Sequence, residues 1–148
     1  MGNIITIDDG SEVFDIVNQR GEHLGQFTFI PSDFDIVNRY DETVKTFEEL
    51  QSELEMGENT DLNEISRKMC EKIDYLFAAP VSEKFFSITS PFTFLNSGQF
   101  FVENVINAIK TVIEQKRGIR LQAVQNRVKE YTQKYKAAPG GRYLSPLK

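Results

Sequence analysis

Two side chains in this sequence are of the types that most often carry nucleophilic or acid–base chemistry near neutral pH. His23 lies in "RGEHLG" and Cys70 in "RKMCEK", and each is the only residue of its type. A Ser–His–acid or Cys–His arrangement would have to use His23. Zinc sites combine several cysteine and histidine ligands, so one of each is too few. We interpret His23 as an exposed strand residue and Cys70 as a half-buried residue of a helix.

The remaining polar patterns also favour a protein without catalytic chemistry. The stretch "DDGSE" (residues 8–12) has acids beside a glycine but lacks the length and ligand spacing of a calcium loop, so we interpret it as a turn. Glycines are scattered singly, which matches neither a P-loop nor a dinucleotide-binding fingerprint. Adjacent carboxylates such as Glu48 and Glu49 belong to the polar face of a predicted helix. We predict a protein that is not an enzyme and needs no cofactor and no metal.

Length and composition indicate one globular domain inside a cell. The 148 residues correspond to a single domain of ordinary size. No apolar run approaches the roughly 18 residues that a membrane span needs, and "MGNIITIDDG" lacks the basic and apolar regions of a secretory signal. A single cysteine excludes an internal disulfide and fits a reducing compartment. We therefore expect an intracellular protein that does not contact membranes.

The first thirty residues predict a β-hairpin. Residues 13–17 are rich in β-branched and aromatic side chains, and "NQRG" (residues 18–21) is a turn sequence with a glycine available for positive φ. The return strand, residues 22–29, alternates with Phe27 and Phe29 on one face. The stretch "NIITI" (residues 3–7) is a candidate third strand. A small sheet of this kind must pack against something, and the helices that follow are the natural partner.

Apolar residues at spacings of three and four predict at least three helices after the hairpin. The first, within residues 31–55, carries an apolar stripe of Val37, Tyr40, Val44, Phe47, Leu50 and Leu54. The second starts at Thr60 or Asp61, ends at "AAP", and carries Leu62, Ile65, Met69, Ile73 and Leu76. The third starts near Ser97 and carries Phe101, Val105, Ile109, Val112 and Ile113. The predicted fold is mainly α with a small N-terminal β-hairpin (α+β), as a bundle of three to four helices.

Between the second and third helices lies the aromatic stretch "VSEKFFSITSPFTFLNSG" (residues 81–98). Pro91 and Gly98 interrupt any helix through it. The stretch is either a buried loop under the helices or an exposed apolar patch for a partner. Burial of most of it is favoured, because apolar residues usually lie inside. We nevertheless include four of its side chains among the candidate partner-binding residues: Phe85, Phe86, Phe92 and Phe94.

A basic stretch, "KRGIRLQAVQNRVKEYTQKYK" (residues 116–136), contrasts with the rest of the chain. It holds seven Lys or Arg and one acid, whereas the whole protein has a formal net charge of -5. Residues 1–109 sum to -13 and residues 110–148 to +8. Leu121, Val124, Val128, Tyr131 and Tyr135 follow heptad spacing. The helix either continues across Gly118 or begins anew there. We divide the chain into residues 1–116 (hairpin and helical body), 117–136 (basic amphipathic helix) and 137–148 (flexible tail).

The basic helix calls for an acidic partner surface. Nucleic acid is disfavoured, because the strongly acidic remainder of the chain would repel it. A neighbouring copy, a client protein, or attraction between the two parts of one fold are the alternatives that remain. The candidate binding residues of this helix are Arg120, Arg127, Lys129, Tyr131, Lys134 and Tyr135.

The order of these features resembles a known family. "FDIVNQRGEHLGQFTF" runs directly into "PSDFDIVNRY" and a long acidic helix, and "FFSITSPFTFLNSGQFFVENVINAI" and "RVKEYTQKYK" follow. Over about residues 13–136 this arrangement resembles the tail assembly chaperones of phages that infect Gram-positive bacteria. The likeness is one of layout, not of an invariant motif. The N-terminal hairpin is not shared by every such chaperone.

The resemblance implies a largely helical protein of the host cytoplasm that is absent from the mature virion. Such chaperones are thought to coat the tape measure protein and to recruit tail tube subunits, and they have no catalytic residues. It also implies self-association in many copies and, in many members, a longer frameshifted form. Two other classes remain open: a structural tail or connector protein, and an acidic inhibitor that mimics nucleic acid and binds a host factor.

Overall fold

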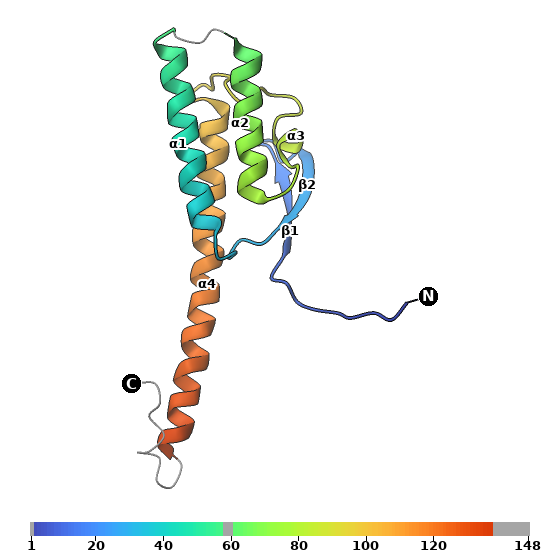
Figure 1. The fold of residues 1–148 in the computed structure, drawn as a ribbon, viewed down its shortest axis with the longest axis vertical. Coiled ribbons are helices and arrows are strands. Elements are labelled where there is room, and N and C mark those ends of the chain that lie inside the picture. Colours follow the sequence, from blue (N-terminus) through green and yellow to red (C-terminus); the bar gives the residue numbers. More distant parts are fainter. Residues whose placement is uncertain (1, 58–60, 138–148) are drawn as a thin grey trace. The chain divides into compact units, whose positions relative to one another are not determined.

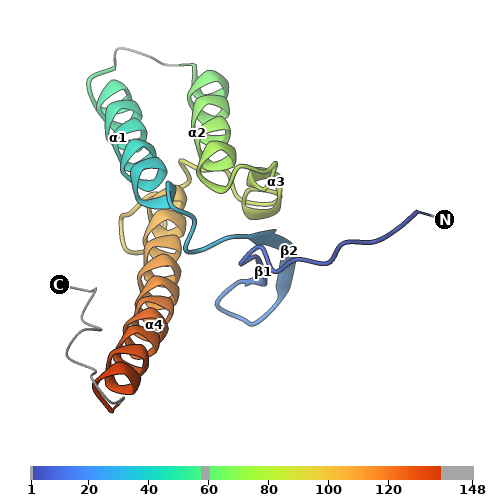
Figure 2. The same cartoon turned by 60° about the horizontal axis from the view of Figure 1, so that its bottom comes forward.

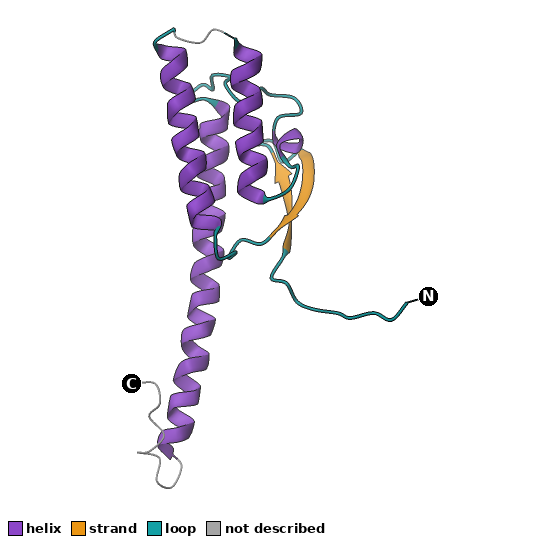
Figure 3. Cartoon of the chain, viewed as in Figure 1, coloured by secondary structure: helices purple, strands orange, loops and turns teal. Residues whose placement is uncertain are grey.

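Two strands and four helices follow one another in the described residues of the computed structural model, which are residues 2–57 and 61–137, with side chains to residue 130. The strands are β1 (Glu12–Val17) and β2 (His23–Phe29). The helices are α1 (Ile36–Glu55), α2 (Leu62–Phe77), α3 (Ser82–Phe85) and α4 (Phe101–Ala137). Figures 1 and 3 show one small sheet beside a set of helices. The predicted α+β fold with a helical bundle is confirmed.

The hairpin forms as predicted. β1 and β2 pair antiparallel, with Phe14 opposite Phe27 and an irregularity between Ile16 and Val17. The side-chain oxygen of Asn18 accepts hydrogen bonds from the backbone N–H groups of Arg20 and Glu22, at 2.9 and 3.0 Å. This side-chain bonding closes the turn. One face of the sheet is aromatic, and it packs on the main core of the body.

The candidate third strand is not formed. Residues 3–7 are not in a strand, and Ile4, Ile5 and Ile7 are 84%, 89% and 76% exposed. The connection to β1 is bonded locally, because Asp8 and Asp9 accept hydrogen bonds from the backbone N–H groups of Gly10 and Ser11, both at 2.9 Å. Side chains, and not a partner strand, therefore satisfy the backbone just before β1.

Helices α1 and α2 lie side by side as an αα-hairpin, with the first part of α4 next to them (Figures 1 and 2). The buried face of α2 contains four of the five predicted residues, whereas Leu62 is exposed. In α1 the predicted stripe is shifted, because Ile36 and Thr43 are fully buried and Val37 is exposed. A threonine is tolerated there because its hydroxyl donates to the Arg39 carbonyl at 2.7 Å.

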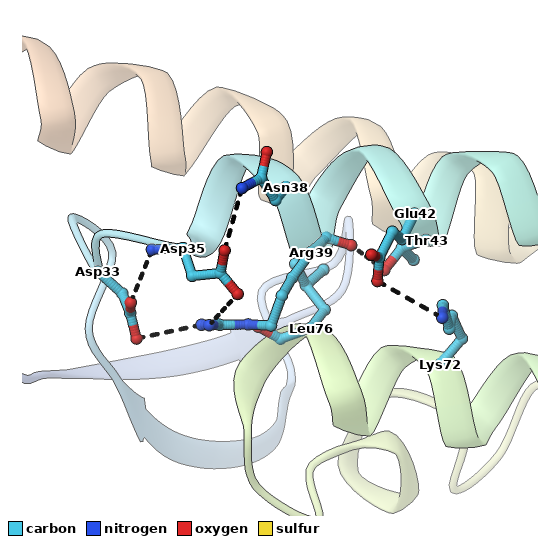
Figure 4. A network of polar contacts seen from close by, with 8 residues as sticks. All are labelled: Asp33, Asp35, Asn38, Arg39, Glu42, Thr43, Lys72 and Leu76. Carbon is cyan, nitrogen blue, oxygen red and sulfur yellow. Dashed lines mark hydrogen bonds and ion pairs between the residues drawn. The ribbon is translucent and has the colours of Figure 1, made fainter.

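Arg39 ties the start of α1 to the end of α2 (Figure 4). Its side chain is only 12% exposed. The guanidinium donates to the carbonyl oxygen of Leu76 at 3.0 Å and to the Asp33 carboxylate at 3.2 Å, and it lies 3.6 Å from Asp35. Leu76 is in the last turn of α2, where carbonyl groups lack partners within the helix. One side chain therefore satisfies a helix end and two carboxylates.

The aromatic stretch is only partly internal, whereas burial of most of it was favoured from the sequence. Val81, Ser82 and Pro91 are buried, but most of the stretch is exposed, chiefly its polar residues and also Ile88 and Phe94. It contains the short helix α3, which the apolar pattern did not predict, and a bridge between Phe94 and Phe100. The predicted start of the third helix near Ser97 is wrong: α4 begins at Phe101. Gly98 adopts φ +87°, and the backbone N–H groups of Leu95 and Gly98 bond to Gln99 and Leu95, so a tight loop occupies these residues.

The chain divides after Ile113 into two compact units, residues 1–113 and residues 114–148. Helix α4 continues through Gly118, which settles the alternative left open by the sequence. The predicted boundary at residue 116 stays a prediction, and the predicted tail lies outside the described residues apart from residue 137. Among the helices of the described part, none combines the length and the apolar composition required to cross a membrane.

Candidate partner-binding surfaces

His23 and Cys70, the two residues of types that often carry catalytic chemistry, lie in β2 and in α2. His23 Nε2 lies 3.3 Å from Asp15 Oδ1 on the exposed face of the hairpin. Burial raises the pKa of the Cys70 thiol, and the nearby charge of Asp74 raises it further. A raised pKa makes a thiol a poorer nucleophile at neutral pH. In the described part of the chain, no group of three or more His, Cys, Asp or Glu is arranged to hold a metal ion.

Three of the four candidate phenylalanines pack against the core. Phe85 lies with its ring centroid 5.5 Å from that of Phe27 and 6.0 Å from that of Phe77. Phe92 contacts Phe47 and Phe100, and Phe86 contacts Phe101. Phe85 and Phe86 thus belong to an aromatic cluster of the hairpin, α2 and the start of α4, and Phe92 to a second cluster with α1.

Phe94 differs from the other three. It is 71% exposed, although one face of its ring stacks on Phe100 at 4.8 Å. Of the four predicted residues, Phe94 thus offers the most surface to a partner. That the four form a binding site stays a prediction, and the structure places most of their area in packing.

A hollow that sequence reasoning missed lies beside the hairpin turn. Its volume is about 640 Å³, and its walls come from the turn, the loop before α4 and the first turns of α4. Polar side chains from "NQRG" and "LNSGQ" share the lining with Ile16, Leu24 and Phe101. The only signal in the sequence was that both stretches are rich in amides, and nothing in their spacing indicates that they meet in space.

The basic helix exposes apolar residues. Leu121 is 54% exposed and Val124 47% exposed, and Val128 is also exposed. Arg127 and Lys129 are exposed and Arg120 is half-buried. The side chains of Tyr131, Lys134 and Tyr135 lie outside the described part of the structure. Residues 114–130 therefore present apolar and cationic side chains together.

Acidic side chains dominate the exposed face of α1. Asp41, Glu48, Glu49 and Glu55 are exposed there. Glu42 lies 3.8 Å from Lys72, and its hydrogen bond to the Tyr75 hydroxyl raises the pKa of that tyrosine. This acidic face and the basic helix are the two surfaces of opposite charge that the composition predicts.

No known protein family, no curated protein and no solved structure matches this chain.

Proposed function

We propose that this protein is a phage tail assembly chaperone, a non-enzymatic protein that binds the tape measure protein and recruits tail tube subunits around it. The observation that supports this proposal best is the exposure of Leu121 and Val124 on a helix rich in cations. A chaperone for a long helical client needs apolar surface that its own fold leaves uncovered.

The spacing of these apolar residues suits a helical client. Residues three and four apart lie on the same face of a helix, and Leu121, Val124 and Val128 follow that spacing. A partner helix recognised in this way presents its own apolar residues at i, i+3, i+4 and i+7. The seam of these three residues is short, so many copies along one client would be needed for tight overall binding.

Charge selects the client. Arg127 and Lys129 flank the seam and are exposed, so an acidic helix gains attraction that a basic one does not. Interactions between exposed charges weaken as the Debye length falls from about 8 Å at physiological salt to about 3 Å at 1 M. We expect client binding to weaken with added salt but not to vanish, because the apolar part persists.

The test is capture of the client with paired variants. A Leu121→Glu/Val124→Glu chain loses the apolar seam, and a Gln122→Glu/Gln125→Glu chain makes the same change in charge at exposed polar positions. Each is expressed in phage-producing cells, and the captured proteins are identified by mass spectrometry, with a tape measure protein as the expected client. We expect the seam variant to lose at least about tenfold in affinity and the control to lose much less.

Equal loss in both variants would mean that charge alone drives binding, and loss in neither would exclude this helix as the client site. Presence of the protein in purified particles would favour a structural tail or connector protein. The exposed carboxylates of α1 support a second candidate, a nucleic-acid mimic. Salt-sensitive capture of a basic host protein, unaffected by the seam variant, would favour it.

A further inference from the structure

The two-stranded sheet has two edges, one along β1 and one along β2. Helix α3 lies against β2, and the Lys84 ammonium donates a hydrogen bond to the backbone carbonyl of Gln26. The Lys84 side chain passes so close to Gly25 that a Cβ there would lie 3.0 Å from the Lys84 Cβ. In the described residues β1 pairs with β2 alone.

The geometry of the ladder shows which backbone groups of β1 face outward. Residues opposite each other in an antiparallel pair alternate between hydrogen-bonded and non-hydrogen-bonded pairs. The Gln26 carbonyl is bonded outside the sheet, so the Asp15–Gln26 pair is of the non-hydrogen-bonded kind. Asp15, and Val13 two residues before it, therefore direct their N–H and C=O groups away from β2.

Beside this edge of β1 lies an apolar groove, which we call the edge groove. It has a volume of about 210 Å³ and runs between residues 14–17 of β1 and the α4 residues Ala108, Ile109 and Val112. Phe27, Phe77 and Phe85 line it as well. A strand lying against β1 here would find backbone partners on one side and apolar side chains under it.

The same chain carries a segment of high β-propensity outside the sheet. Residues 3–7, "NIITI", are β-branched apart from Asn3, carry no charged side chain, and expose three isoleucines. Such a sequence has high β-propensity and gains stability by burying its side chains on a sheet. An open sheet edge can pair with such a segment, and natural proteins usually protect or cover their edges.

We propose that residues 3–7 of one copy add as a strand to the β1 edge of a second copy and place isoleucine side chains in the edge groove. A second copy is the occupant because every copy carries both the exposed segment 3–7 and the edge groove, and in the single chain residues 3–7 do not line that groove. Strand addition of this type joins backbone hydrogen bonds with pockets for alternate side chains. The inference is independent of the proposed client and of the basic helix.

The test uses two variants that are each defective in one half of the contact. Replacing residues 3–7 by Gly and Ser leaves a copy that can only accept a strand. Ala108→Glu places a charge in the edge groove at an exposed position of α4 and leaves a copy that can only donate. Asn107→Glu is the control, because Asn107 is also exposed but does not line the groove.

Association is measured by sedimentation velocity in about 1 M salt, where attraction between charged surfaces is largely screened. We expect the unaltered chain and the Asn107→Glu chain to self-associate. Each defective variant alone should associate with a Kd at least about tenfold higher. The two defective variants mixed together should form a one-to-one heterodimer, because one intact contact remains.

Three results would overturn the proposal. The unaltered chain could remain a monomer at all concentrations, the Gly-Ser variant could associate as strongly as the unaltered chain, or the mixture could show no heterodimer. Circular dichroism of each variant checks that the helical body is folded. A binding measurement with a synthetic peptide of residues 2–9 is an independent test. The peptide should bind the Gly-Ser variant, and it should not bind a chain that combines the Gly-Ser replacement with Ala108→Glu.

Discussion

Replacing Arg39 by alanine should destabilise the body of the protein more than any exposed ion pair can. The substitution removes hydrogen bonds to Asp33 and to the Leu76 carbonyl, at 3.2 and 3.0 Å, and an ion pair with Asp35 at 3.6 Å. Hydrogen bonds involving a charged group contribute about 1.5–3 kcal/mol each. The two carboxylates are 34% and 52% exposed and regain water, which reduces the loss.

We therefore expect Arg39→Ala to lower the free energy of unfolding by about 2–3 kcal/mol. For a chain of this size that corresponds to a fall in Tm of about 5–10 °C. Urea denaturation followed by far-UV circular dichroism and tyrosine fluorescence measures it, since the chain has no tryptophan. The control is Arg20→Ala, whose side chain is 78% exposed and pairs with Glu22, and which should cost at most about 1 kcal/mol.

The pH dependence gives a second check on the same reasoning. The backbone N–H of Asp35, and then Arg39, hold the pKa of Asp33 below its ordinary value of 3.8. A lowered folded-state pKa means stabilisation that is present above the ordinary value and is lost as the pH falls through the folded value. The difference in the free energy of unfolding between the original chain and the Arg39→Ala chain should therefore become smaller below pH 3.8. If Arg39→Ala lowered the free energy of unfolding only as much as Arg20→Ala does, and by the same amount at acidic pH, the reasoning would be refuted.

Three further predictions concern the core position Met69, the end of α2 at Ala78, and the reactivity of Cys70. Met69→Ala, at a fully buried position, should lower the free energy of unfolding by about 2–5 kcal/mol, whereas Leu62→Ala at an exposed position of the same helix should change it by less than about 0.5 kcal/mol in urea titrations. Ala78→Gly should raise it by about 0.5–1 kcal/mol, because Ala78 ends α2 with φ +55° and glycine adopts positive φ without strain. Cys70 should react with a thiol reagent at pH 8 more slowly than a free cysteine peptide, because burial raises its pKa; equal rates would contradict that assignment.

The fold was largely predictable because its elements are strongly periodic. The stripe of α2 from Ile65 to Leu76 and the turn at Gly21 are local signals, and the structure contains both. The buried face of α1 differs from the predicted stripe because it includes Thr43, which is polar. The Thr43 hydroxyl donates a hydrogen bond within its own helix, so its burial costs little free energy. Periodicity of apolar residues cannot reveal such a position.

The candidate surfaces were less predictable for a different reason. The sequence alone does not show whether a phenylalanine of the aromatic stretch is buried or exposed. Only the structure shows that Phe85 packs against the core while Phe94 is largely exposed. The edge groove depends on β1 and α4, which are separated by more than eighty residues in the sequence, so no local pattern marks it.

The places where local rules are broken are the most informative ones for function. A β-branched segment outside the sheet and apolar residues at heptad spacing exposed to solvent are both unfavourable in an isolated chain. Ile5 belongs to the β-branched segment and Leu121 to the exposed heptad residues, and each lies outside the main apolar core. In the described part of the chain both surfaces are exposed, and their patterns suit an extended partner and a helical partner respectively. The proposed contact between copies would cover the first of these surfaces, and the proposed client helix would cover the second.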